Sequence, residues 1–181
     1  MTIPSPAWGG TRHVELRPLG PDDRDRLLAW LDPGDAEAWL ASIGGDSRQH
    51  GWIVDLDGAP AGLAGLVDIE RGHQRCAWAC HLALSDPALD AYVRYWGAEY
   101  VFEGLGFAKL WCEAPAADAT LLARLESYGF VVEARLRGHI ARGAERVDVV
   151  RLGILAADWR STRAAMAARL LVLGFEVPEI G

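Results

Sequence analysis

Hydrophobic and polar residues alternate along four stretches in the first half of the chain, and a period of two is typical of half-buried strands. The predicted strands cover 13–19, 51–56, 60–70 and 75–84. Asp57-Gly58 separates the second stretch from the third and is typical of a two-residue hairpin turn. Arg71-Gly72 turns the chain into the fourth stretch. The last three stretches therefore predict an antiparallel meander.

Helical spacing of hydrophobic residues appears between the first two strands. Two short helices are predicted there, over 22–31 and 35–43. Pro33-Gly34 is expected to break the chain between them, and Gly44-Gly45 is expected to end the second.

A long helix is predicted directly after the fourth strand, from residue 86 to about 105. Its apolar stripe recurs at spacings of four and five and consists of Tyr92, Trp96, Tyr100 and Leu105. Gly106 is expected to end it. The rest of the pattern predicts a strand over 108–113, a helix over 118–128, a hairpin over 130–155 and a terminal helix over 158–173.

The composition predicts one soluble globular domain, since 51% of the 181 residues are hydrophobic and 24% are charged. No apolar run approaches the ~20 residues that a membrane-spanning helix needs, so no membrane partner is expected. The segment 1–12 lacks the charged start and apolar core of a signal peptide and is expected to be a flexible tail. Cys76, Cys80 and Cys112 form no C-x-x-C pair and are expected to be reduced thiols of a cytoplasmic protein.

The charge balance and the residue spacings exclude several classes of function. A net charge of −7 disfavours a broad nucleic-acid surface, which needs clustered Lys and Arg. No spacing of His, Cys and acidic residues matches a metal site, so no metal is expected. No Ser-His-Asp arrangement and no Walker-type phosphate loop is present in the sequence.

The second half of the chain carries a series of short motifs in order. They are Tyr100-Val101-Phe102-Glu103, Leu105-Gly106, Tyr128-Gly129-Phe130, Glu133, Leu136-Arg137, His139, Val147-Asp148, Leu152-Gly153 and Asp158-Trp159. Their order and spacing resemble the GNAT acyltransferase superfamily, in the branch that contains the ribosomal-protein N-terminal acetyltransferases. The resemblance covers about residues 14–160 and is strongest over 98–159.

The resemblance implies an α/β fold of the α+β type, in which helices flank a mixed, mostly antiparallel, twisted sheet. It implies a GNAT-like domain over 13–160. Beyond it, the apolar stripe Met166, Leu170 and Leu173 predicts that the helix and tail over 161–181 pack on the domain or on a second subunit of a homodimer. The resemblance also implies an N-acyltransferase without a metal, which moves an acyl group, by default acetyl from acetyl-CoA, to a small-molecule or peptide amine. In this family the amine attacks the thioester directly.

Three features depart from the family pattern. Leu125 stands where the family has a tyrosine acid, and Asp118 stands near the place of an asparagine. The stretch 85–90 has no glycine, although the family has a glycine loop for the acyl-CoA diphosphate at this junction. Ser85 is expected to cap the long helix, and Asp86 and Asp90 place two carboxylates where a diphosphate would bind.

The resemblance places any chemistry where the fourth and fifth strands separate. The catalytic candidates are His81, Glu113 and Asp118; the acceptor candidates are Trp30, Trp39, Trp52, Asp68 and Glu70; the donor candidates are Leu82, Leu84 and Arg94. A neutral imidazole accepts a proton from an amine near pH 7, and aromatic walls suit a partly apolar acceptor. Each side chain also has a structural explanation, as a packed histidine, a helix cap, a solvated acid or a core tryptophan.

Two other functions remain open at this stage. The first keeps the fold but takes the acyl group from a charged tRNA or a carrier protein, as some GNAT-fold enzymes of natural-product pathways do. A tRNA donor requires that the arginines of the closing hairpin collect on one face; they are Arg135, Arg137, Arg142, Arg146 and Arg151. The second is a non-catalytic module that binds a ligand or a partner.

Overall fold

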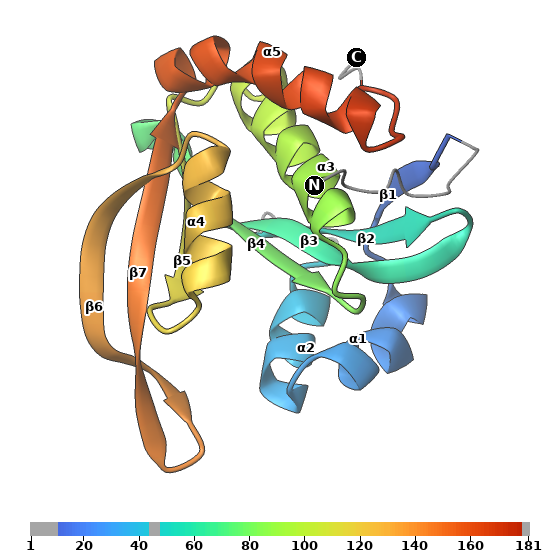
Figure 1. Ribbon diagram of the computed structural model, residues 1–181. Helices are drawn as coiled ribbons and strands as arrows, with labels where there is room; N and C mark the ends of the chain where they lie inside the picture. The colour runs from blue at the N-terminus through green and yellow to red at the C-terminus, as the bar shows by residue number, and fades with distance from the viewer. Residues whose placement is uncertain (1–10, 44–47, 179–181) are drawn as a thin grey trace, which may run out of the picture.

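Within the residues that this computed structural model describes, 11–43 and 48–178, seven strands form one sheet in the order β1-β2-β3-β4-β5-β7-β6 (Figure 1). They are β1 Val14–Pro18, β2 His50–Leu56, β3 Ala59–Glu70, β4 Arg75–Leu82, β5 Lys109–Pro115, β6 Val131–Arg142 and β7 Glu145–Leu155. β4 and β5 pair in parallel, and the other neighbours pair antiparallel. This confirms the mixed, mostly antiparallel sheet expected from the sequence. Most of the expected 1–12 tail lies outside the described residues, as do Gly44 and Gly45.

The helices lie on both faces of this sheet. They are α1 Arg24–Trp30, α2 Pro33–Ala41, α3 Pro87–Glu99, α4 Ala119–Ser127 and α5 Ala156–Val172. A small core joins Leu27 of α1 and Trp39 of α2 to Ile53 and Leu63 of the sheet. The main core joins the other helices to the opposite face.

Strand alternation decides which side chains reach which core. Ile53 and Leu63 face α1 and α2, while their neighbours Val54 and Ala64 belong to the main core under α3. This follows because successive side chains of a strand point to opposite faces of the sheet. The face that carries α1 and α2 is called the α2 face below, and the other is called the α3 face.

The start of α2 differs from the sequence-based expectation. Pro33 is the first residue of the helix, after Asp32, whereas Pro33-Gly34 was expected to lie between two helices. Proline is favourable in the first turn because its missing N–H would have no partner inside the helix there. α2 therefore begins two residues earlier than predicted and carries Asp35 in its first turn.

The uneven spacing of the stripe on α3 has a structural cause. The helix continues through a π-helical turn, Tyr100–Gly104, in which the N–H of Leu105 donates to the carbonyl of Tyr100 at 2.9 Å. The wider turn returns Leu105 to the packed side of the helix five residues after Tyr100, rather than four. Closer to the middle, Gly97 lets α3 approach the sheet, since a Cβ there would stand 2.7 Å from the ring of Trp78.

The last helix packs on α3. Trp159, Met166 and Leu170 of α5 are buried in the main core. The indole N–H of Trp159 donates to Glu99 of α3 at 2.6 Å, and Arg163 pairs with the other oxygen of Glu99 at 2.6 Å. α5 thus closes the same core that α3 and the sheet form.

Candidate active site

The ladder between β4 and β5 ends inside the sheet. The two strands pair over Arg75–Ala77 and Lys109–Trp111, whereas β4 runs on to Leu82 and β5 to Pro115. Figure 1 shows the two strands diverging beyond this point. The peptide groups beyond the ladder are therefore open to another extended molecule, because they are not bonded to the facing strand.

On the α2 face, titratable side chains flank this opening. Cys80 and Cys112 belong to the α3 face, so their neighbours His81 on β4 and Glu113 on β5 point to the α2 face. One oxygen of Glu113 accepts from the guanidinium of Arg151 on β7, at 2.7 and 3.0 Å. His139 Nε2 lies 3.8 Å from its other oxygen. His81 is exposed, whereas Glu113 is held in an ion pair.

The guanidinium of Arg151 also lies over the ring of Trp111, 4.1 Å from its centroid. Trp111 lies two residues before Glu113 on β5 and therefore points to the same face. Arg151 is thus fixed from two sides, which holds the carboxylate of Glu113 in place.

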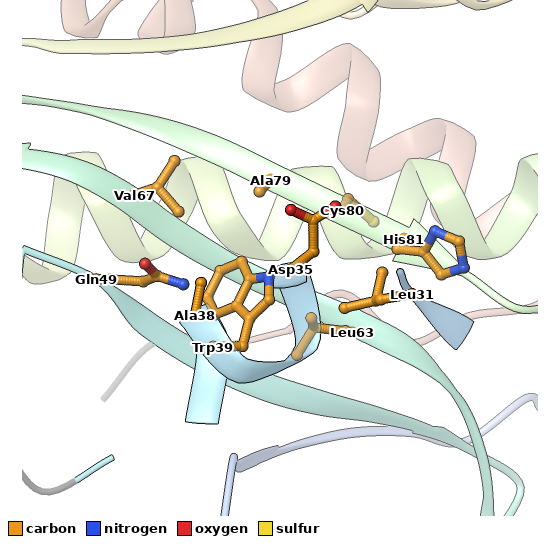
Figure 2. Close-up of a pocket in the computed structure, with 10 residues that line it drawn as sticks. All are labelled: Leu31, Asp35, Ala38, Trp39, Gln49, Leu63, Val67, Ala79, Cys80 and His81. Carbon is orange, nitrogen blue, oxygen red and sulfur yellow. The ribbon is translucent and has the colours of Figure 1, made fainter. Parts of the chain in front are cut away.

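A pocket of about 310 Å³ lies between α2 and the sheet and extends to His81 (Figure 2). Its lining residues are Leu31, Asp35, Ala38, Trp39, Gln49, Leu63, Val67, Ala79, Cys80 and His81. The ring of Trp39 lies directly on the sheet, since a Cβ at Gly65 would stand 2.5 Å from it. His81, near the end of β4, is among the lining residues, so the pocket reaches the part of β4 that lies beyond its ladder with β5.

On the α3 face, a buried ion pair lies under the opening. Arg94 Nε donates to Asp90 at 2.9 Å, and the two side chains are only 9% and 10% exposed. Arg124 of α4 approaches the other oxygen of Asp90, at 3.7 Å. That oxygen and the hydroxyl of Tyr128 make no hydrogen bond within the described part of the chain.

The thiols beside this ion pair are not set up as nucleophiles. Burial raises the pKa of Cys80 to about 12 and the pKa of Cys112 to about 11. A cysteine reacts as its thiolate, so thiols with such pKa values stay protonated and inert near neutral pH. Burial likewise raises the pKa of Tyr128 to about 12.

The N-terminus of α3 is capped by its own chain. Asp86, not the expected Ser85, is the N-cap, and it accepts from the N–H groups of Ala88 and Leu89 at 2.9 and 3.1 Å. Arg12 donates to its second oxygen at 2.5 Å. Burial by itself would raise the pKa of Asp86, but the hydrogen bonds from Arg12 and these amides outweigh it and lower the pKa. This helix end therefore already holds an anion, which is the Asp86 carboxylate.

The structure separates the predicted acceptor residues. Trp39 lines the pocket, whereas Trp30 packs against the smaller core and does not line it. Trp52 lies on the other face: its ring packs against Trp96 and Tyr100, at 5.1 and 5.2 Å, on the α3 face, and its role at the acceptor stays a prediction. The physical reason is that Ile53, its neighbour on β2, faces α1 and α2.

The two acids at the end of β3 lie beside a second, more polar pocket. Asp68 and Glu70 both line this pocket of about 330 Å³, together with Trp111 and Arg151. A register shift after Val67 places Asp68 at φ 50°. Glu70 is paired with Arg75 at 2.8 Å, so of these two carboxylates only Asp68 lacks an ion pair among the described residues.

The other candidates are found in structural settings. Asp118 caps α4, where its carboxylate accepts from the N–H of Leu121 at 2.9 Å. Arg94 is buried against Asp90 rather than available at the surface. Leu82 packs against the main core, and Leu84 is 55% exposed. The roles assigned to these four residues stay predictions.

Two residues near the opening, Asp35 and Arg12, were not identified from the sequence. Asp35 and Trp39 lie four residues apart on α2, a spacing that puts them on one helix side, and both line the pocket. That spacing was the available signal. Arg12 left no signal, because it contacts Asp86 across 74 residues of sequence.

The described residues contain no group of three His, Cys, Asp or Glu side chains that could hold a metal ion. None of their helices is long and apolar enough to cross a membrane.

Comparison with known proteins shows the fold. No protein-family model matches the sequence, and no curated protein matches it. The structure is similar to spermidine/spermine N-acetyltransferase SpeG from Vibrio cholerae, with a TM-score of 0.74 and 18% identity over 82% of this chain and 95% of that one. It is also similar to a protein presumed to be an acetyltransferase, with a TM-score of 0.71 and 20% identity over 94% and 96% of the two chains. The chain therefore has the fold of the GNAT acetyltransferases.

Proposed function

We propose that this protein is an N-acyltransferase that moves an acyl group, acetyl by default, from a thioester donor to an amine. The opening between β4 and β5, with His81 beside it on the α2 face, is the observation that carries this proposal. Solved structures similar to this fold include N-acetyltransferases, which supports the assignment of a reaction class. The motifs over 128–159 support a place in the branch of the ribosomal-protein N-terminal acetyltransferases. Cytoplasmic location and a homodimer remain predictions.

His81 is the residue that we assign to proton transfer. An amine that attacks an acyl carbonyl must give up a proton, and a neutral imidazole near the nitrogen accepts it. The exposed His81 lines the pocket that leads to the opening, so an amine bound there has access to its ring. Glu113 is paired with Arg151, and we assign it the role of shaping the opposite side of the opening.

The N-terminus of α3, as it stands, does not fit the diphosphate of acyl-CoA. The two amides that would meet an anion donate to Asp86, and Arg12 already neutralises that carboxylate. A diphosphate there would have to displace a carboxylate held by three hydrogen bonds. We therefore assign no residue of this helix end to the donor.

This capped end favours a second candidate within the same fold. A donor whose acyl group is carried on a protein, or on a tRNA, need not place a diphosphate at the start of α3. A non-catalytic binding module is a third candidate. Of the hairpin arginines that a tRNA donor needs, Arg151 is paired with Glu113, which leaves one fewer unpaired cation for RNA.

The test is an acyl-transfer assay on the purified protein, with acetyl-CoA and a panel of amines, following release of free thiol. We expect turnover by the wild type and a loss of about 100-fold in kcat/KM for His81→Ala, because general-base catalysis contributes ~10²–10⁴-fold. His73→Ala is the matched control, since that histidine is 75% exposed in its side chain and lies outside the pocket. It should retain wild-type activity.

The outcomes separate the three candidates. Thiol release that is equal in wild type and His81→Ala would remove His81 from the mechanism. No binding of acetyl-CoA, with transfer from an acyl carrier protein or a charged tRNA, would favour the second candidate, and a salt-sensitive interaction would identify the RNA donor. If the protein neither binds a donor nor transfers an acyl group, the non-catalytic binding module is the remaining candidate.

A further inference from the structure

We propose that the pocket between α2 and β4 selects an acceptor with one ammonium group on a compact apolar body, and that Asp35 is the counter-ion for that ammonium. The inference rests on the proposed function, because it takes the ligand of this pocket to be the amine that is acylated. Asp35 is a specificity-determining residue in this proposal.

Asp35 is an available carboxylate on the wall of the pocket. It makes no ion pair or hydrogen bond within the described part of the chain, whereas Glu37 on the same helix is paired with Arg24. Figure 2 shows its carboxylate directed from α2 toward β4, at the level of Ala79 and Cys80. Asp35 is exposed, so an ammonium that enters the pocket reaches its carboxylate without displacing a protein partner.

The other walls of the pocket suit an apolar body. Six of the lining side chains are hydrophobic: Leu31, Ala38, Trp39, Leu63, Val67 and Ala79. The ring of Trp39 offers an aromatic surface of fixed position, since it lies against Gly51 and Gly65. A volume of about 310 Å³ stands at the lower end of the ~300–1,000 Å³ typical of small-molecule sites, so the body must be compact.

The neighbouring surface does not favour a second ammonium. A shallow pocket of about 290 Å³ adjoins the first and shares Ala38, Gln49 and Val67 with it. Its charged groups are one acid, Asp68, and one base, Arg48, whose effects on a cation oppose each other. A long polyamine would therefore gain little from extending into it, and a monoamine satisfies the site.

The position of Asp35 also agrees with the chemistry of acyl transfer. Cys80 and His81 of β4 line the same pocket, at the end where β4 leaves β5. An ammonium held by Asp35 is therefore bound in the same pocket as His81, the side chain that we assign to its deprotonation. Binding of the charged form and loss of its proton then occur in one site.

The proposal is tested by binding in the absence of any donor, with calorimetry on the full chain. The probes are phenethylamine, its uncharged analogue 2-phenylethanol, and spermidine. We expect Asp35→Asn to weaken phenethylamine at least tenfold and to leave 2-phenylethanol unchanged, because the substitution removes a charge and keeps the shape. Asp32→Asn is the matched control: Asp32 precedes α2, makes no side-chain cap and lies outside the pocket, so both ligands should bind as to the wild type.

The results that overturn the proposal are definite. They are no phenethylamine binding by the wild type, equal phenethylamine affinity in Asp35→Asn, or tighter binding of spermidine than of phenethylamine. The acyl-transfer assay separates this inference from the proposed function. Asp35-dependent binding without any transfer would retain the ligand class and reject the acyltransferase, whereas transfer with an unchanged KM in Asp35→Asn would do the reverse.

Discussion

Asp23 is a carboxylate with 1% of its surface exposed, and four hydrogen bonds surround it. Arg17 donates twice, at 2.6 and 2.8 Å, Arg26 donates at 2.6 Å, and the N–H of Gly20 donates at 3.1 Å. The hydrogen bonds from Arg17, and then those from Gly20 and Arg26, outweigh burial and hold the pKa of Asp23 far below its usual range. One residue thereby fixes the entry into α1 against β1.

This residue makes the stability of the protein depend on pH in a defined direction. A carboxylate whose pKa is lowered by folding contributes stability above its unfolded pKa of ~3.9, and that contribution is lost as the pH falls toward the folded pKa. We expect Asp23→Asn to reduce the free energy of unfolding by about 2–3 kcal/mol at pH 7, in part because Arg17 loses its partner. The difference from the wild type should shrink below about pH 4.

Urea denaturation between pH 3 and pH 8 measures this difference. Asp22→Asn is the control, because Asp22 is the exposed neighbour and should change stability by less than about 0.5 kcal/mol. A gap between Asp23→Asn and wild type that is the same at pH 3 and pH 7 would show that the charge of Asp23 is not the cause.

Single residues also show how far the sequence alone can go. Alternation along β4 placed His81 opposite Trp78 and Cys80, and in the structure these two residues belong to the main core. It was not enough for Trp52, since Ile53 and Val54 are both apolar and nothing local says which core each one joins. Asp35 was missed because the residue pattern of a short helix does not show which of its sides faces the sheet.

The first turn of α3 is the place where the family pattern has the donor site. The sequence predicted an acidic helix start whose amide groups are bonded by a residue of the same chain. The structure has such a start, with Asp86 rather than Ser85 as the cap. The contribution of Arg12 could not be predicted, since it depends on how the start of the chain crosses the helix. Likewise, the strands and turns are local signals, whereas the end of the β4–β5 ladder depends on pairing between distant segments.

Removal of the Asp86 cap tests whether this carboxylate keeps CoA from the N-terminus of α3. We expect Asp86→Gly to increase the affinity for CoA several-fold, because it frees the amides of Ala88 and Leu89 and the guanidinium of Arg12 for an anion. The same change should cost only a few tenths of a kcal/mol of stability through the lost cap. Calorimetry with CoA gives the affinity, and Ser85→Gly is the control that leaves Asp86 in place. Equal CoA affinity in the two variants would contradict this account.

At the scale of the whole molecule, α5 belongs to the main core. Leu170 is fully buried, while the next residue, Leu171, is 61% exposed. This arrangement follows the alternative in which the last helix packs on the domain, although the sequence did not decide between that and a second subunit. The residue pattern of this helix shows that it has an apolar stripe, but it does not show which surface packs against that stripe.

Leu170 and Leu171 provide a matched pair for a test of this packing. Leu170→Ala should lower the free energy of unfolding by about 3 kcal/mol, because it opens a cavity in a packed core. Leu171→Ala should change it by less than about 0.5 kcal/mol. Urea denaturation at two protein concentrations measures both values. If the two variants are equally stable, or if the loss appears only at high concentration, α5 does not pack on its own domain in solution.

The contact between the two ends of the described chain has a consequence for biosynthesis. The N–H of Arg12 donates to the carbonyl of Gly174 at 2.8 Å, and the guanidinium of Arg12 lies over the ring of Phe175 while it pairs with Asp86. A growing chain on the ribosome makes Arg12 long before Phe175. Contacts that join such distant segments form late and slow the folding reaction. Arg12 must therefore wait until the segment that follows α5 has emerged before this junction can be completed.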